Sequence, residues 1–265
     1  MKKMQLDTKW GTVCYFISKA WDRSRETIFF LHGMTADHTL FDRQYEYFGK
    51  DFNLITWDAP AHGQSRPFEK FTYETAAVCA KKILDLCGVS QAVFVGQSMG
   101  GFISQSVIKR FPVAVRAFVS IDSCPFGEGY YSPSDRWWLR QIEWMSGLFP
   151  ERVLKAAIAY QVAVTKEARS DMLRMLCGYG KKELCHLMGV GFGGFLEDNC
   201  DLEIKCPVLL VVGEKDRTGK VISYNRAWSR RTGFALVTVM GAAHNSNADK
   251  PHEVNNVISE YINTL

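Results

Sequence analysis

Short apolar runs alternate along the chain with longer segments in which apolar residues recur at helical spacing. Six runs are almost wholly apolar: Ile28–Leu31, Asn53–Trp57, Ala92–Val95, Ala117–Ile121, Val208–Val212 and Phe234–Met240. Runs of this length without a polar face are typical of parallel strands that are covered on both sides. Because strands alternate with helices, the pattern predicts an α/β fold with a mostly parallel, doubly wound sheet.

Helical spacing is clearest in the segments 73–87, 99–109 and 251–261. In the first of these, the apolar residues favour one side, and Gly88 closes the segment. At the N-terminus, residues alternate on either side of Trp10-Gly11, which predicts a β-hairpin over residues 4–18.

The alternation of strands and helices stops between Ser123 and Ile204, where no run has the pattern of a strand. This stretch contains four helix-like segments: 135–147, 151–162, 166–177 and 181–188. We interpret it as an all-helical insertion over the sheet. The predicted division is therefore a core of residues 1–122 and 206–265, interrupted by an insertion of residues 123–205. Gly189–Gly194, with four glycines in six residues, is interpreted as a mobile segment beside a pocket entrance.

The sequence Gly96-Gln97-Ser98-Met99-Gly100 lies between a predicted strand and a predicted helix. In one interpretation this is an ordinary turn and Ser98 only caps the helix. In the other, Gly96 and Gly100 let the chain turn so sharply that Ser98 is presented as a nucleophile. Backbone N–H groups at the start of the helix would then point toward the reacting atom. The strand–turn–helix context favours the nucleophile.

A serine hydroxyl needs a base to become a nucleophile, and the base needs a carboxylate to orient it. His244 and Asp216 each follow a predicted strand, at the edge of the sheet where the active sites of open α/β folds are built. The chain order Ser98, Asp216, His244 is one that such a triad adopts. Asp122 also follows a strand and is a rival for the acid. Otherwise we expect Asp122 to line the pocket or to brace the loops.

An oxyanion hole requires two backbone donors aimed at the developing negative charge. The N–H of Met99 is the natural first donor. The second is expected from the loop His32-Gly33-Met34-Thr35, where Met34 is the candidate and Gly33 allows a close approach of the backbone. His32 is expected to orient this loop by hydrogen bonding rather than to transfer protons.

Five segments together resemble the α/β-hydrolase fold superfamily, in particular its members with a helical cap. They are LHGM (31–34), DAPAHGQS (58–65), GQSMGG (96–101), VVGEKD (211–216) and GAAHNS (241–246). The resemblance covers essentially the whole chain. It implies Ser98 as nucleophile, His244 as base and Asp216 as orienting acid, with the Met34 and Met99 amides as oxyanion donors.

The resemblance also decides two details. It favours Asp216 over Asp122 as the acid, because Asp216 stands at the position of the aspartate in the family's G-x-x-D pattern. The segment 58–65 is structural in the family, so that His62 receives no catalytic role. Here Ala61 stands where the family usually has glycine.

Charge and cysteine content narrow the classes of function. The 32 basic and 28 acidic residues are dispersed, so that no nucleic-acid partner is expected. The N-terminus lacks the apolar stretch of a secretory signal, and no run is long enough to span a bilayer, which predicts a cytoplasmic protein without membrane contact.

The eight cysteines form no C-x-x-C pair and are expected to be reduced and mostly buried. Three histidines, His38, His186 and His252, have no companions at metal spacing, so that no metal is expected. A serine hydrolase mechanism needs no cofactor, and none is expected.

The insertion is rich in aromatic residues and methionines, which predicts an apolar pocket above Ser98, with most of the aromatics holding the insertion together. Trp138 and Asp122 are candidate pocket residues. The predicted function is a serine hydrolase that cleaves a small to medium, largely apolar ester or related acyl substrate through an acyl-enzyme on Ser98. A carbon–carbon bond hydrolase or lyase on the same scaffold, and a ligand-sensing protein with little turnover, remain open. The natural substrate and the oligomeric state are not predicted.

Overall fold

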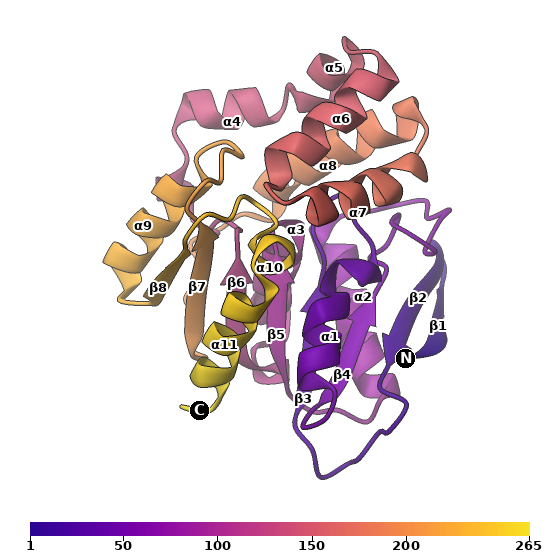
Figure 1. Cartoon of the computed structure of the whole chain (residues 1–265), viewed down its shortest axis with the longest axis vertical. Coiled ribbons are helices and arrows are strands. Elements are labelled where there is room, and N and C mark those ends of the chain that lie inside the picture. Colours follow the sequence, from indigo (N-terminus) through magenta and orange to yellow (C-terminus); the bar gives the residue numbers. More distant parts are fainter.

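The computed structural model describes residues 1–265 and contains one eight-stranded sheet between layers of helices (Figure 1). The strands are β1 (Lys2–Thr8), β2 (Gly11–Ile17), β3 (Thr27–Leu31), β4 (Asn53–Trp57), β5 (Ala92–Gln97), β6 (Val115–Ile121), β7 (Val208–Gly213) and β8 (Ala235–Val239). They lie in the order β1-β2-β4-β3-β5-β6-β7-β8. The strands β3 to β8 are all parallel, whereas β2 pairs antiparallel with β1 and with β4.

The predicted fold class and the predicted strands are confirmed. Each of the six apolar runs coincides with a strand to within two residues, and the N-terminal hairpin is formed by β1 and β2. The strand β3 shows why these runs have no polar positions. Phe29 and Leu31 point into the core on one face of the sheet, and Ile28 and Phe30 point into the core on the other.

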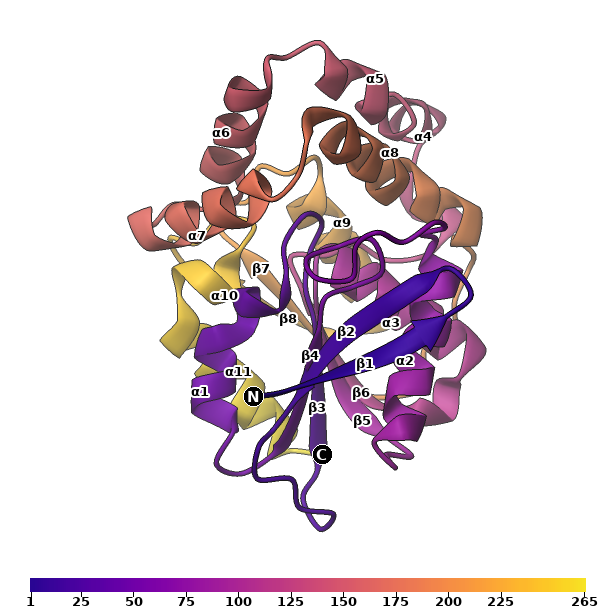
Figure 2. The same ribbon diagram turned by 90° about the vertical axis from the view of Figure 1, so that its right-hand side faces the viewer.

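Helices cover both faces of the sheet. One face carries α2 (Tyr73–Leu86), α3 (Met99–Arg110) and α9 (Val221–Thr232). The other carries α1 (Asp42–Phe48) and α11 (Pro251–Ile262), with the short α10 (Ser246–Asp249) beside it (Figure 2). Two short 3-10 helices belong to the core, η1 (His38–Phe41) and η2 (Pro112–Ala114), and a third, η3 (Glu128–Tyr130), lies in the insertion that follows β6.

Five helices lie between β6 and β7 and arch over one end of the sheet (Figures 1 and 2). We call them the cap: α4 (Pro133–Leu139), α5 (Ile142–Gly147), α6 (Glu151–Val162), α7 (Lys166–Cys177) and α8 (Lys181–Asp198). Two sequence predictions need correction. The single helix expected over 135–147 is two helices that meet at residues 140–141, and the helix expected to end at residue 188 continues to Asp198.

The glycine-rich segment Gly189–Gly194 belongs to α8, so that its interpretation as a mobile segment is wrong. Glycine weakens a helix in isolation by about 1 kcal/mol relative to alanine. Here the missing side chains let neighbouring helices approach. A Cβ added at Gly189 would lie 2.6 Å from the Cβ of Glu143 in α5. Packing against α5 therefore outweighs the low helical propensity of this segment.

The cap aromatics also differ from the prediction. Five of them are more than half exposed: Trp137, Trp138, Trp144, Phe149 and Tyr160. They therefore contribute little to holding the cap together. Buried contacts are instead made by residues such as Tyr179 and Phe195, together with leucine and methionine side chains of α7 and α8.

Two further expectations concern the state of the cysteines and the presence of a membrane-spanning segment. All eight cysteines are free thiols; four are buried, three are partly buried and Cys177 is exposed. None of the helices combines the length and the apolar character that crossing a bilayer requires.

Asp198, the last residue of α8, joins the cap to the core. Its carboxylate accepts hydrogen bonds from Lys109 Nζ at 2.9 Å and from Arg110 Nη2 at 2.7 Å, both in α3. Burial alone would raise the pKa of Asp198, but the hydrogen bonds from Arg110, Ser106 and Lys109 outweigh it and hold the pKa below its usual range.

We expect Asp198→Ala to lower the free energy of unfolding by about 2 kcal/mol, because it removes the buried carboxylate that Lys109 and Arg110 share. Urea denaturation of the purified protein measures this change. Glu197→Ala removes the exposed neighbouring carboxylate and should change the free energy by less than about 0.5 kcal/mol. Equal effects of the two substitutions would contradict the role of Asp198.

Candidate active site

Ser98 lies on a sharp turn between β5 and α3. Its φ of 50° and ψ of −113° place it in a region that non-glycine residues rarely adopt, and its N–H donates to the Ile121 carbonyl at 2.9 Å. A Cβ at Gly96 would collide with the Gly100 carbonyl group, and one at Gly100 would collide with the Leu31 carbonyl oxygen. Both glycines are therefore required for the turn that exposes the Ser98 hydroxyl.

The structure brings together the three side chains that the sequence predicted to meet. His244 Nε2 lies 2.9 Å from Ser98 Oγ, and His244 Nδ1 lies 2.8 Å from Asp216 Oδ2. Each residue follows a different strand: β5, β7 or β8. Because parallel strands end at the same edge of the sheet, these distant segments converge there.

The electrostatic environment of His244 favours its charged form. Burial opposes protonation, but the charge of Asp216 and its hydrogen bond outweigh burial, so that the pKa of His244 lies above its usual value of 6.5. A neutral His244 with its proton on Nδ1 donates to Asp216. Its Nε2 then carries a lone pair toward the Ser98 hydroxyl, which is the geometry of a general base.

Asp122 lies at the end of β6 but does not hydrogen-bond to His244. Its Oδ1 accepts the Gly213 N–H at 2.7 Å, and its Oδ2 accepts the Ser246 N–H at 3.0 Å. Burial, with the nearby charge of Asp216, raises the pKa of Asp122 to about 8. Asp122 thus braces the two loops that carry Asp216 and His244, as expected for a residue other than the orienting acid.

Two backbone donors are free beside Ser98. The N–H of Met99 is at the first position of α3, where no intrahelical acceptor exists, and neither it nor the N–H of Met34 donates to any acceptor in the chain. Gly33 allows the loop to approach closely, since a Cβ there would collide with the Gln97 side-chain oxygen. Both N–H groups proposed for the oxyanion hole are therefore available to a ligand.

His32 holds the loop that precedes Met34. Its Nδ1–H donates to the Gly33 carbonyl at 2.7 Å, and its Nε2 accepts the Ala59 N–H at 2.9 Å. Burial lowers the pKa of His32, so that the ring is neutral. These contacts match the loop-orienting role predicted from the sequence.

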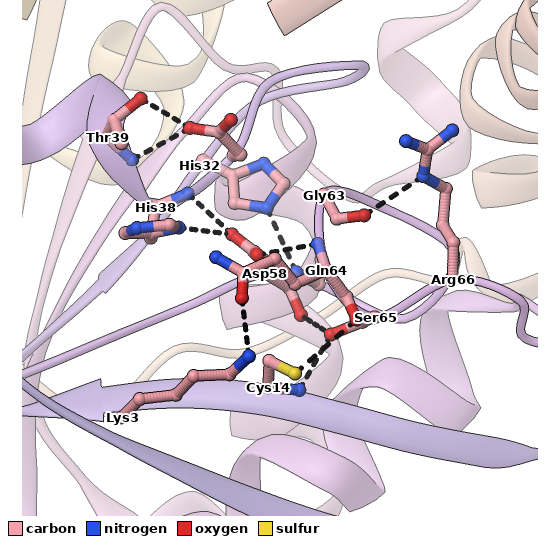
Figure 3. Close-up of polar contacts among 12 residues, drawn as sticks. Lys3, Cys14, His32, His38, Thr39, Asp58, Gly63, Gln64, Ser65 and Arg66 are labelled. Atoms are coloured by element: carbon pink, nitrogen blue, oxygen red, sulfur yellow. Dashed lines mark hydrogen bonds and ion pairs between the residues drawn. The ribbon is translucent and has the colours of Figure 1, made fainter. Parts of the chain in front are cut away.

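A carboxylate organises the segment 58–65 (Figure 3). Asp58 accepts the His38 backbone N–H at 2.8 Å, His38 Nδ1 at 2.7 Å and the Gln64 N–H at 2.7 Å. The prediction that His38 has no companion is therefore wrong, because Asp58 and Asp37 lie beside it. Both oxygens of Asp58 are occupied by N–H donors, which makes the cluster a brace between two loops.

Ala61, which stands where the family usually has glycine, has a φ of 64°, the conformation that glycine adopts most easily.

Two polar residues that hold the His244 loop escaped the sequence analysis. Gln97 Nε2 donates to the His244 carbonyl at 2.9 Å. Asp249 accepts the N–H groups of Ala243, Val164 and Thr165 at 2.9–3.1 Å, which ties this loop to the turn between α6 and α7. Gln97 is adjacent to Ser98 in the sequence, but nothing in the sequence around Asp249 indicates its contacts.

A cavity of about 510 Å³ lies between the cap and the carboxyl end of the sheet, and Ser98 and His244 line its floor. Most of its lining residues are apolar, and the cap contributes Trp138, Leu139, Ile142, Met188, Phe192 and Phe195. Trp138 and Asp122, the two candidate pocket residues, both line this cavity. An ion pair between Lys220 Nζ and Asp135 Oδ1, at 2.7 Å, joins the core to α4 at this cavity.

Comparison with known proteins agrees with this architecture. Residues 26–160, half of the chain, match the family described as the alpha/beta hydrolase fold. The chain belongs to this family. The mostly parallel eight-stranded sheet with helices on both faces is the alpha/beta-hydrolase fold of this family.

Relatives of this alpha/beta hydrolase include esterases. The AB hydrolase superfamily protein YisY of Bacillus subtilis is 25% identical over 259 residues, which cover 89% of this chain and 91% of YisY. Pimeloyl-[acyl-carrier protein] methyl ester esterase of Hamiltonella defensa is 32% identical over 96 residues, 36% of this chain and 35% of the esterase. A thermophilic esterase from Thermogutta terrifontis superposes with a TM-score of 0.79 at 17% identity, covering 100% of this chain and 99% of its own, which shows the shared fold.

Proposed function

We propose that this alpha/beta hydrolase is a serine hydrolase that cleaves a small to medium, largely apolar ester or related acyl substrate through an acyl-enzyme on Ser98. The observation that carries the proposal is the hydrogen-bonded series Ser98–His244–Asp216 at the floor of an apolar cavity. The partner is a small molecule, and the reaction needs no cofactor. The cytoplasmic location stays a prediction.

In the first half-reaction, His244 Nε2 takes the proton of Ser98 Oγ as this oxygen attacks the substrate carbonyl carbon. The carboxylate of Asp216 stabilises the imidazolium that forms. The negative charge that develops on the carbonyl oxygen is received by the N–H groups of Met34 and Met99. When the ester bond breaks, His244 gives its proton to the departing alcohol, and the acyl group remains on Ser98.

In the second half-reaction, a water molecule occupies the space that the alcohol has left. His244 removes one proton from this water while its oxygen attacks the acyl carbonyl, and the same two N–H groups stabilise the second oxyanion. The collapse of the intermediate breaks the bond to Ser98 Oγ. His244 then returns the proton to this oxygen, and the carboxylic acid leaves.

The cavity supports the proposed substrate class. Its volume of about 510 Å³ suits a small molecule rather than a polymer. Its apolar cap wall favours an apolar acyl chain because burying such a chain releases it from water. Similarity to an esterase over 36% of the chain supports ester cleavage over carbon–carbon bond cleavage.

Labelling with a fluorophosphonate, followed by turnover of p-nitrophenyl esters from acetate to decanoate, tests the proposal. We expect fast labelling at Ser98 and measurable turnover that is highest for medium acyl chains. Labelling with negligible turnover of every ester would contradict the proposal in favour of ligand sensing. A wild-type protein that does not label at all would overturn the assignment of Ser98 as nucleophile.

The pH dependence of kcat/KM should report His244. Its imidazole must be neutral to take the proton of Ser98, so that activity falls as the pH is lowered through the pKa of His244. Because this pKa is raised, the midpoint of the acid limb should lie above 6.5. A profile of kcat/KM between pH 5 and 9 with a p-nitrophenyl ester measures it. A midpoint clearly below 6.5 would contradict the pairing of His244 with Asp216.

A further inference from the structure

One face of the cap helix α8 is turned toward the active-site cavity. Met188, Phe192 and Phe195, at positions spaced by four and three residues, all line the cavity. Gly191 lies on the same face, one turn after Met188 and one turn before Phe195, and is buried. The inward face of α8 therefore has a notch at Gly191, between large apolar side chains.

The side chain of Met34 occupies this notch. A Cβ added at Gly191 would overlap the terminal methyl carbon of Met34 and would lie 2.8 Å from its sulfur atom. Met34 also lines the cavity, and its backbone N–H is one of the two proposed oxyanion donors. The glycine thus accommodates a side chain that would otherwise occupy space beside Ser98.

The helix itself is fixed at this point. The buried Tyr73, from the core helix α2, donates a hydrogen bond of 2.7 Å from its Oη to the Gly191 carbonyl oxygen. One turn further along, the Phe195 ring stacks on Phe102 of α3, with ring centroids 4.3 Å apart. A side chain at residue 191 would therefore displace Met34 rather than α8. The thioether of Met34 is flexible, and the open space next to it is the cavity.

We propose that Gly191 is a specificity-determining residue, whose missing side chain houses Met34 and keeps the cavity beside Ser98 open to medium-length acyl chains. The inference rests on the proposed function, because it concerns the acyl pocket of that same site. It assigns a role to the glycine-rich segment of α8 beyond the packing of α5 against this helix.

The substitution Gly191→Ala tests the proposal. The new methyl group should push the Met34 methyl into the cavity and remove the space of one to two methylene groups. Because each buried methylene contributes roughly fourfold to binding, kcat/KM for p-nitrophenyl octanoate should fall about tenfold. The value for p-nitrophenyl acetate should stay within about twofold, since a two-carbon acyl group fills little of the pocket.

Two comparisons separate this effect from a general disturbance of the helix. Gly194→Ala adds a methyl group to the same helix, at an ordinary contact of 3.4 Å from Val190, and should leave the chain-length profile unchanged. In a Met34→Ala background, Gly191→Ala should lower kcat/KM for p-nitrophenyl octanoate by less than about twofold, because the Met34 methyl group that it would displace is absent. The Tm values of Gly191→Ala and of Gly194→Ala should not fall below that of the wild type, since alanine favours a helix over glycine.

The outcomes decide the proposal. A loss confined to long chains and cancelled by Met34→Ala supports it. An unchanged profile, a loss of equal size for acetate and octanoate, or a loss that persists in the Met34→Ala background overturns it. A wild-type protein without turnover would defeat the proposed function. An active wild type whose chain-length profile is unchanged in the Gly191→Ala variant would defeat only this inference.

Discussion

Replacing Ser98 with alanine is expected to abolish ester turnover, with a fall in kcat of at least about 10⁵-fold. The Ser98 hydroxyl is the only group at the floor of the cavity that hydrogen-bonds to His244 Nε2. Without it, the cavity can still bind an ester and the two backbone N–H groups can still polarise its carbonyl. No covalent intermediate can form, however, and the residual rate is that of water attack.

The substitution should leave the fold intact. Alanine is smaller than serine, and the Ser98 hydroxyl has no hydrogen bond other than the one to His244. Ser120→Ala is a suitable control, because Ser120 is buried in the adjacent strand β6 and its hydroxyl has no partner. We expect the control to retain activity within about twofold and both variants to keep a wild-type Tm. Turnover by Ser98→Ala above one part in a hundred would exclude Ser98 as nucleophile.

Asp216→Asn is expected to lower kcat by about 10⁴-fold with little change in KM. The carboxylate of Asp216 accepts the Nδ1 proton of His244 and thereby leaves Nε2 free to act as base. An amide nitrogen in this place would donate to Nδ1 instead. The proton of the neutral ring would then move to Nε2, where it blocks transfer from Ser98.

Asp122→Asn provides the matched comparison for this prediction. Asp122 is also a buried carboxylate at the end of a strand, but its partners are the backbone N–H groups of Gly213 and Ser246. Its substitution should displace the supporting loops slightly and lower kcat by about tenfold. Measuring kcat of Asp216→Asn and of Asp122→Asn under the same conditions decides which of the two aspartates orients His244. A nearly silent Asp216→Asn together with a severe Asp122→Asn would reverse the assignment of the acid.

The sheet and the three convergent side chains could be predicted from the sequence because both follow from local patterns. Apolar runs without a polar face specify strands that are buried on both sides, as in β3. A polar residue within a few positions after such a run lies near the carboxyl edge of a parallel sheet. Ser98, Asp216 and His244 each follow such a run, so that their position at one edge is predictable without any knowledge of their contacts.

The cap could be predicted only in outline, because its details depend on contacts between distant segments. Gly189–Gly194 has the composition of a loop, yet it is helical since α5 and Met34 fill the space left by its missing side chains. The tryptophans of α4 and α5 have the composition of a core but are more than half exposed, and of the three only Trp138 also lines the cavity. Hydrophobicity alone does not tell which side of a short helix faces the pocket.

The polar braces could not be predicted for a similar reason. Asp58 and His38 are twenty residues apart, and Asp249 binds a turn more than eighty residues away. No spacing rule connects such pairs, because their meeting depends on how two loops cross above the sheet. The sequence therefore reveals the groups proposed to react, and the structure adds the groups that hold them.

Rapid-quench mass spectrometry during the first turnover of p-nitrophenyl octanoate tests the central claim most directly. We expect the mass of one octanoyl group on the peptide that contains Ser98, formed together with the burst of p-nitrophenol and lost at the rate of steady-state turnover. An acyl group found on a different residue, or steady turnover in which the Ser98 peptide never carries one, would contradict the account.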